Sequence, residues 1–143
     1  MNYAEDWRAE APYIVQQLEA SSDAVLIGSR TEAFLQWARK HTLASTAETL
    51  PDVKPLSNFE WLENEKSAVI DTMHILKVVK EAYLNPTVEV ITFCNTGHWA
   101  TVNWFVLSEL AHFETVKLYT GSMFDWSNHW HHMENTPNLL ENL

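Results

Sequence analysis

Hydrophobic and polar positions change period along the chain, which predicts helices interleaved with short strands. Apolar side chains at helical spacing predict helices that include residues 13–18, 34–38, 59–62, 75–82 and 100–110. Short apolar runs predict strands at residues 24–27, 88–93 and 116–119, and a last helix after Gly121 and Ser122. The stretch from Thr42 to Asn58 carries no clear pattern, and we interpret it as a connection inside one domain.

Strands separated by helices are typical of a mostly parallel β-sheet with helices on both faces, so the predicted fold class is α/β. The chain has 143 residues, of which 46% are hydrophobic, and this fits one domain, residues 1–143, around a single core. In such sheets, reactive groups lie where the carboxyl end of a strand meets the next helix. Cys94 occupies such a position.

Charge and cysteine content narrow the classes of function. Nine Lys and Arg against nineteen Asp and Glu give a net charge of -10, which argues against nucleic acid and anionic membrane surfaces as partners. A single cysteine cannot form an internal disulfide and suits a reducing compartment. No stretch approaches the ~20 apolar residues needed to cross a bilayer, and the first residues do not resemble a signal peptide. We therefore expect a cytoplasmic protein.

The segment Phe93-Cys94-Asn95-Thr96-Gly97-His98-Trp99-Ala100 places the only thiol between a predicted strand and a predicted helix. Gly97 allows the loop to curl with its backbone N–H groups pointing inward, and the start of a helix adds partial positive charge. Both effects favour an anionic sulfur, either a thiolate or a persulfide. A buried cysteine of the core is the alternative interpretation.

Cys94, Gly97 and Ala100 fill the pattern Cys-x-x-Gly-x-x-Ala, and the chain thereby resembles the rhodanese family of sulfurtransferases over about half of its length. The similarity continues through residues 103–110 and 116–122 and through Trp126. It implies a rhodanese-like fold and a cysteine nucleophile. In that chemistry, Cys94 takes a sulfane sulfur from thiosulfate or a persulfide and passes it, as a persulfide, to cyanide or a thiol. The residues we expect to bind substrate are Asn95, Thr96, Gly97, His98, Trp99, Ala100 and Arg30.

The N-terminal half departs from the family pattern. Arg30 is kept, but Gly28 stands where many relatives carry an aspartate, and residues 43–51 are the nearest candidate for a second family motif. Arg30 is either part of a structural ion pair or a cation near the pocket, and His98 is either a hydrogen-bond donor or a spacer. The degenerate half also leaves a second hypothesis open, a non-catalytic rhodanese-fold binding or regulatory module.

Two other chemistries are disfavoured. A phosphatase loop of the form Cys-x-x-x-x-x-Arg needs an arginine where this chain has Ala100. In the segment 129–132, only His129 and His132 have the spacing of ligands on one helical face, and we interpret the segment as a solvated terminal helix. We expect no metal and no cofactor. The expected partners are a small-molecule sulfur donor and a thiol or cyanide acceptor, with a protein as a further candidate acceptor.

Overall fold

The fold is built on one parallel β-sheet. The structure is a computed structural model that describes residues 7–30, 53–62, 71–94 and 97–128. Within these residues the sheet has the order β2-β1-β3-β4, and every pairing between neighbouring strands is parallel. The strands are β1 (Val25–Gly28), β2 (Val53–Pro55), β3 (Val90–Phe93) and β4 (Val116–Leu118). The predicted α/β class is confirmed.

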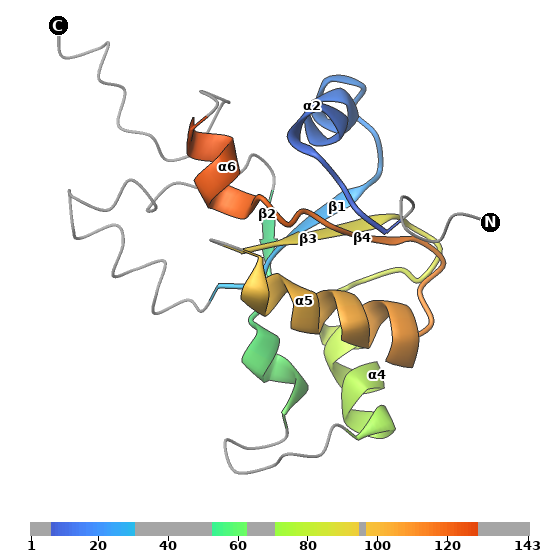
Figure 1. The fold of residues 1–143 in the computed structure, drawn as a ribbon. Coiled ribbons are helices and arrows are strands. Elements are labelled where there is room, and N and C mark those ends of the chain that lie inside the picture. Colours follow the sequence, from blue (N-terminus) through green and yellow to red (C-terminus); the bar gives the residue numbers. More distant parts are fainter. Residues whose placement is uncertain (1–6, 31–52, 63–70, 95–96, 129–143) are drawn as a thin grey trace, which may run out of the picture.

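Helices cover both faces of the sheet (Figure 1). The helices α2 (Ala11–Glu19) and α6 (Ser122–Asn128) lie on one side, and α4 (Thr72–Glu81) and α5 (His98–Phe105) on the other. Successive strand residues alternate between the two layers, because the side chains of a strand point to opposite faces. Leu26 packs in the core under α2 and α6, whereas Ile27 packs in the core that includes α4.

Helix α4 shows how the sequence determines an element. Asp71 caps its first turn by accepting a hydrogen bond from the His74 backbone N–H at 3.2 Å. Ile75, Val78 and Val79 follow at helical spacing and are buried against the sheet. The helix ends at Glu81, ahead of Pro86, as the apolar pattern predicts.

Strand β2 corrects the interpretation of residues 42–58 as a connection. Residues 53–55 pair with β1 in parallel, with Pro55 opposite Gly28. The strand has only three residues and no alternating pattern, so periodicity could not reveal it. Proline is tolerated there because β2 forms one edge of the described sheet. The helix predicted at residues 34–38 and the motif candidate at residues 43–51 lie outside the described residues.

Helix α5 and the turn that follows it have a buried side and an exposed side, and apolar residues lie on both. It continues into a π-helical turn, η2 (Val106–Leu110). Val106 and Leu107 are fully buried, whereas Val102 and Phe105 are exposed. In the part of the chain that the structure describes, no helix is long and apolar enough to cross a membrane.

The burial of Leu107 and the exposure of Phe105 lead to a prediction about stability. Leu107→Ala should lower the free energy of unfolding by about 2–5 kcal/mol, because it opens a cavity in the core. Phe105→Ala should cost no more than about 1 kcal/mol, because 47% of Phe105 is exposed. Urea unfolding of the two variants measures both values. Equal losses of unfolding free energy in the two variants would contradict the described burial of Leu107 and exposure of Phe105.

Candidate active site

Cys94 directly follows β3 and is almost completely buried, with 3% of its surface exposed. Its backbone is held by the first turn of α6. The Cys94 backbone N–H donates to Ser122 Oγ at 3.0 Å, and the Met123 N–H donates to the Cys94 carbonyl at 3.1 Å. The position of the cysteine therefore depends on a helix that follows it by almost thirty residues in the sequence.

Gly97 directs a backbone N–H at the sulfur. The Gly97 N–H donates to Cys94 Sγ at 3.0 Å. Gly97 has a φ of 93°, and a Cβ atom there would lie 2.7 Å from the carbonyl oxygen of Thr120. Both the backbone conformation and the available space therefore require glycine. Asn95 and Thr96, the other residues of this part of the loop, lie outside the described residues.

Arg30 is buried in electrostatic range of Cys94. It lies two residues beyond the end of β1, and 2% of its surface is exposed. Burial lowers its pKa to about 10, while negative charge on Cys94 acts in the opposite direction. The guanidinium therefore stays protonated at neutral pH. Which of the two roles left open by the sequence Arg30 has, structural ion pair or cation near the pocket, stays a prediction.

Arg30 also faces a cavity of about 310 Å³ on the side of β2 and α4. The residues that line the cavity with it are Pro55, Leu56, Ser57, Glu60, Val78, Glu81 and Ala82. Cys94 is not part of this lining. The buried arginine thus lines a partly acidic cavity that does not include the cysteine.

Gly28, which stands where many relatives carry an aspartate, is closely packed between two strands. A Cβ atom at Gly28 would lie 3.0 Å from Val53 Cγ1 and 3.5 Å from Phe93 Cζ. A side chain at this position would require the Val53 side chain on β2 to shift by a few tenths of an ångström.

A buried amide network lies next to this site, and sequence reasoning missed it. Asn103 on α5 is fully buried. Its Nδ2 donates to Ser29 Oγ at 2.7 Å and to the Leu56 carbonyl at 2.8 Å, and its Oδ1 accepts from Trp61 Nε1 at 2.6 Å. In the sequence, Asn103 is only a polar break in an apolar stretch. A lone amide on the buried side of a helix is a signal for such a network, since buried polar groups are almost always paired.

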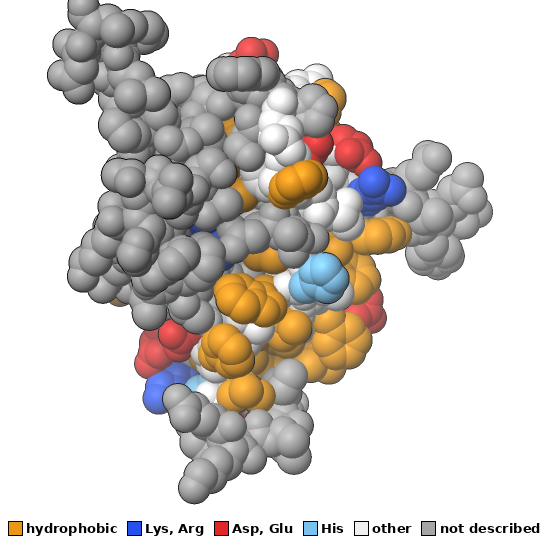
Figure 2. Space-filling model, turned by 60° about the vertical axis from the view of Figure 1, so that its left-hand side comes forward, with side chains coloured by type: hydrophobic (Ala, Val, Ile, Leu, Met, Phe, Trp, Pro, Cys, Tyr) orange, Lys and Arg blue, Asp and Glu red, His pale blue; other side chains and the backbone are white. Residues whose placement is uncertain are grey.

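The remaining predicted site residues lie at the start of α5. Ala100 is fully buried and packs in one cluster with Cys94 and Leu118. His98 and Trp99 are on the surface, and 38% of Trp99 is exposed. Figure 2 shows hydrophobic side chains gathered on this side of the molecule.

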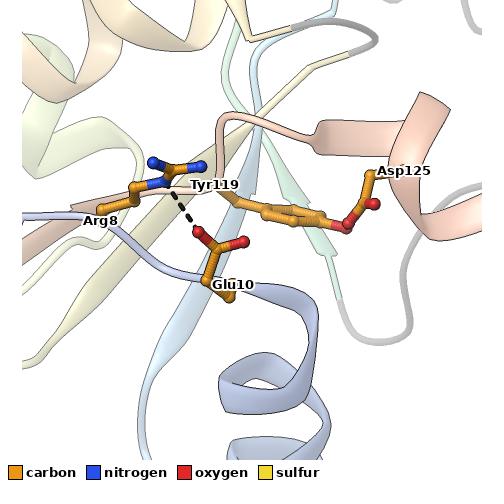
Figure 3. Close-up of polar contacts among 4 residues, drawn as sticks. All are labelled: Arg8, Glu10, Tyr119 and Asp125. Atoms are coloured by element: carbon orange, nitrogen blue, oxygen red, sulfur yellow. Dashed lines mark hydrogen bonds and ion pairs between the residues drawn. The ribbon is translucent and has the colours of Figure 1, made fainter.

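A second polar contact supports α6, between Tyr119 before the helix and Asp125 within it (Figure 3). The Tyr119 hydroxyl donates to Asp125 Oδ2 at 2.5 Å, and burial together with this carboxylate raises the pKa of Tyr119 far above its ordinary value. Arg8 and Glu10 form an exposed ion pair at 2.8 Å nearby. Because Tyr119 and Asp125 flank Ser122, their bond fixes the turn that holds the Cys94 backbone.

The described residues contain no group of three or more His, Cys, Asp or Glu side chains that could hold a metal ion. His129 and His132 lie outside the described residues. The chemical groups that the structure brings together are a thiol, a backbone N–H and a buried guanidinium. This arrangement can hold a nucleophilic, anionic sulfur.

Comparisons with known proteins place the chain in a family. The family model described as a rhodanese-like domain matches residues 22–129. A thiosulfate sulfurtransferase of Pseudomonas aeruginosa is 31% identical over 96 residues, which cover 66% of this chain and 34% of that protein. A thiosulfate sulfurtransferase of Corynebacterium glutamicum is 40% identical over 47 residues, which cover 33% of this chain and 16% of that protein. The chain thus spans about a third or less of these curated relatives.

Solved structures share the fold at low sequence identity. A probable thiosulfate sulfurtransferase has a TM-score of 0.66 at 20% identity, covering 92% of this chain and 49% of the other. The anaerobic ergothioneine biosynthesis enzyme of Chlorobium limicola has a TM-score of 0.70 at 17% identity, covering 88% and 31% of the two chains. The family match extends over more than half of the sequence and includes β1, β3, the Cys94 loop and α6. The chain belongs to the rhodanese-like domain family.

Proposed function

We propose that this protein is a sulfurtransferase that carries sulfane sulfur on Cys94. The observation on which the proposal rests is the surroundings of the sulfur: a buried thiol that accepts a hydrogen bond from Gly97 and lies near the cationic Arg30. Family membership and relatives named thiosulfate sulfurtransferase support this chemistry.

In the first step, the Cys94 thiolate attacks the outer sulfur of a donor such as thiosulfate. The sulfur–sulfur bond of thiosulfate breaks, sulfite leaves with the electron pair, and Cys94 becomes a persulfide. The Gly97 N–H is already directed at Sγ, so it can stabilise negative charge without reorganisation. Arg30 adds a full positive charge from a site where water does not screen it.

In the second step, cyanide or a thiolate attacks the outer sulfur of the persulfide. The bond to Cys94 Sγ breaks, its electron pair returns to the cysteine as a thiolate, and thiocyanate or a new persulfide leaves. The same N–H and guanidinium therefore stabilise the attacking group of the first step and the leaving group of the second. No other nucleophile is needed, and the chain has no second cysteine.

The charge distribution favours a donor with little charge over thiosulfate. Residues 97–128 contain one Lys or Arg, Lys117, and its Nζ lies over the Tyr13 ring at 5.2 Å from the ring centre. With a net charge of -10, the protein repels a dianion on approach. We infer that a persulfide is a better donor than thiosulfate, which should turn over slowly.

We further infer that residues 1–143 form one rhodanese-like domain and that the protein works in the cytoplasm. A single thiol that must stay reduced between turnovers suits a reducing compartment. Thiols and persulfides, the substrates of the proposed reaction, persist in the same conditions.

A protein thiol is a further candidate acceptor, and the exposed side of α5 favours it. We define the α5 apolar surface as Trp99, Val102 and Phe105, which are 38%, 37% and 47% exposed. This surface begins directly after the Cys94 loop. Exposed apolar groups beside a reactive site favour contact with a protein segment over a small ion. The acidic chain favours a basic segment as the partner.

Intact-mass measurement tests the proposed function. After incubation with thiosulfate or with a small-molecule persulfide, the protein should gain one sulfur atom, and cyanide should remove it. Cys94→Ser should gain none while keeping its thermal midpoint, because the Gly97 N–H can still bond a hydroxyl oxygen. If no donor gives an adduct, the protein is the non-catalytic binding module instead.

Two synthetic peptides test the protein acceptor. Both peptides contain one cysteine flanked by leucines. The basic peptide also contains lysines, and the acidic peptide contains glutamates at the same positions. The basic peptide should accept sulfur with a kcat/KM about tenfold higher. Phe105→Ser should lower kcat/KM with the basic peptide and leave turnover with cyanide unchanged, whereas Tyr83→Ser, at an exposed aromatic after α4, should change neither. Equal rates for both peptides in the unmodified protein would refute this partner.

A further inference from the structure

We propose that Asn103 is a positioning residue of this site: its buried amide holds the end of β1 so that Arg30 lies beside Cys94. The proposal rests on the proposed sulfur-transfer function. Asn103 is on α5, away from the reacting sulfur, and would act through Arg30. Nothing in the family pattern of the Cys94 loop indicates this role.

Ser29 connects the amide to the site. Its backbone N–H donates to the Phe93 carbonyl at 2.9 Å, and its Oγ accepts from Asn103 Nδ2 at 2.7 Å. Arg30 directly follows Ser29, and Cys94 directly follows Phe93. Arg30 and Cys94 therefore each lie one residue beyond a member of the same hydrogen-bonded pair. A shift of Ser29 would move the guanidinium relative to the sulfur.

The other two bonds of the amide fix it from the opposite side. Asn103 Nδ2 donates to the Leu56 carbonyl, and Oδ1 accepts from Trp61 Nε1, so both sides of the amide are used. Leu56 and Trp61 are themselves buried. The Leu56 carbonyl needs a donor and the Trp61 N–H needs an acceptor. An asparagine supplies both groups, and an apolar side chain supplies neither. Leaving either unpaired in this core would cost free energy, so the amide has one stable orientation.

The network also holds the end of β1 without adding charge near Arg30. At this strand end, Ser29 is bonded by the neutral amide of Asn103. Burial lowers the pKa of Arg30, and negative charge on Cys94 acts in the opposite direction. Within the described residues, the elements packed against β1, β3 and α5 also carry the titratable groups Lys54, Glu60, Glu109 and Lys117. His98 lies on α5 itself, and Tyr119 and Asp125 lie beside the turn that holds the Cys94 backbone. The hydrogen bonds of the Asn103 amide go to Ser29, Leu56 and Trp61.

The test is the pH dependence of Cys94 alkylation by iodoacetamide, followed by intact mass. The chain has one cysteine, so the measurement reports only this thiol. Asn103→Leu, which is neutral and similar in size, should raise the pH midpoint of alkylation by about half a unit or more. Ser29→Ala should shift it in the same direction and perturbs the core less. Tyr13→Phe removes a hydrogen bond to the Glu89 carboxylate in the core on the other face of the sheet, and should leave the midpoint unchanged.

A second comparison tests whether Asn103 acts on Cys94 through Arg30. In an Arg30→Met background, Asn103→Leu should add no further shift of the midpoint. The inference is overturned if Ser29→Ala and Asn103→Leu keep the unmodified midpoint, if Tyr13→Phe shifts it equally, or if the Asn103 and Arg30 effects are additive. If Asn103→Leu does not fold, Ser29→Ala decides. Absence of a persulfide on the unmodified protein would refute the proposed function, which is a separate result.

Discussion

The parallel pairing of β1 with β3 is the constraint on which the site depends. Parallel strands end at the same edge of a sheet, so Arg30 and Cys94 both lie at that edge although they are far apart in the sequence. The Ser29–Phe93 hydrogen bond closes this pairing immediately before both residues. A buried cation and a buried thiol are each costly alone, because burial disfavours charge. Placed together, a positive guanidinium and an anionic sulfur reduce that cost for one another.

The elements that follow the sheet hold the sulfur in a defined geometry. Gly97 supplies an N–H to Sγ in a conformation that other residues rarely adopt, and the close approach of Thr120 excludes a side chain there. Ser122 holds the Cys94 backbone, and the Tyr119–Asp125 bond supports the turn that carries Ser122. The start of α5 and the first turn of α6 thus hold one residue, Cys94, through its sulfur and its backbone. The proposed transfer of an anionic sulfur would use this preorganisation.

Local sequence patterns predicted the fold class and the place of Cys94 between a strand and a helix. Both predictions use signals that lie within one segment: the period of the apolar residues and a seven-residue motif. They could not place Arg30, whose role depends on strand order. They missed β2, since three residues leave no period. They also gave no indication of which side of α5 is buried, so the pairing of Asn103 and the exposure of Phe105 emerged only from the structure. The roles proposed for His98 and Trp99 stay predictions.

The central claim is that the positive charge of Arg30 stabilises an anionic Cys94. The most direct measurement compares the alkylation midpoint of Cys94 in the unmodified protein, in Arg30→Lys and in Arg30→Met, with folding checked by thermal unfolding. Loss of the charge in Arg30→Met should raise the midpoint by about one pH unit, and Arg30→Lys should retain part of the effect. If Arg30→Met folds and alkylates with the unmodified midpoint, the guanidinium does not act on the sulfur and the account is wrong.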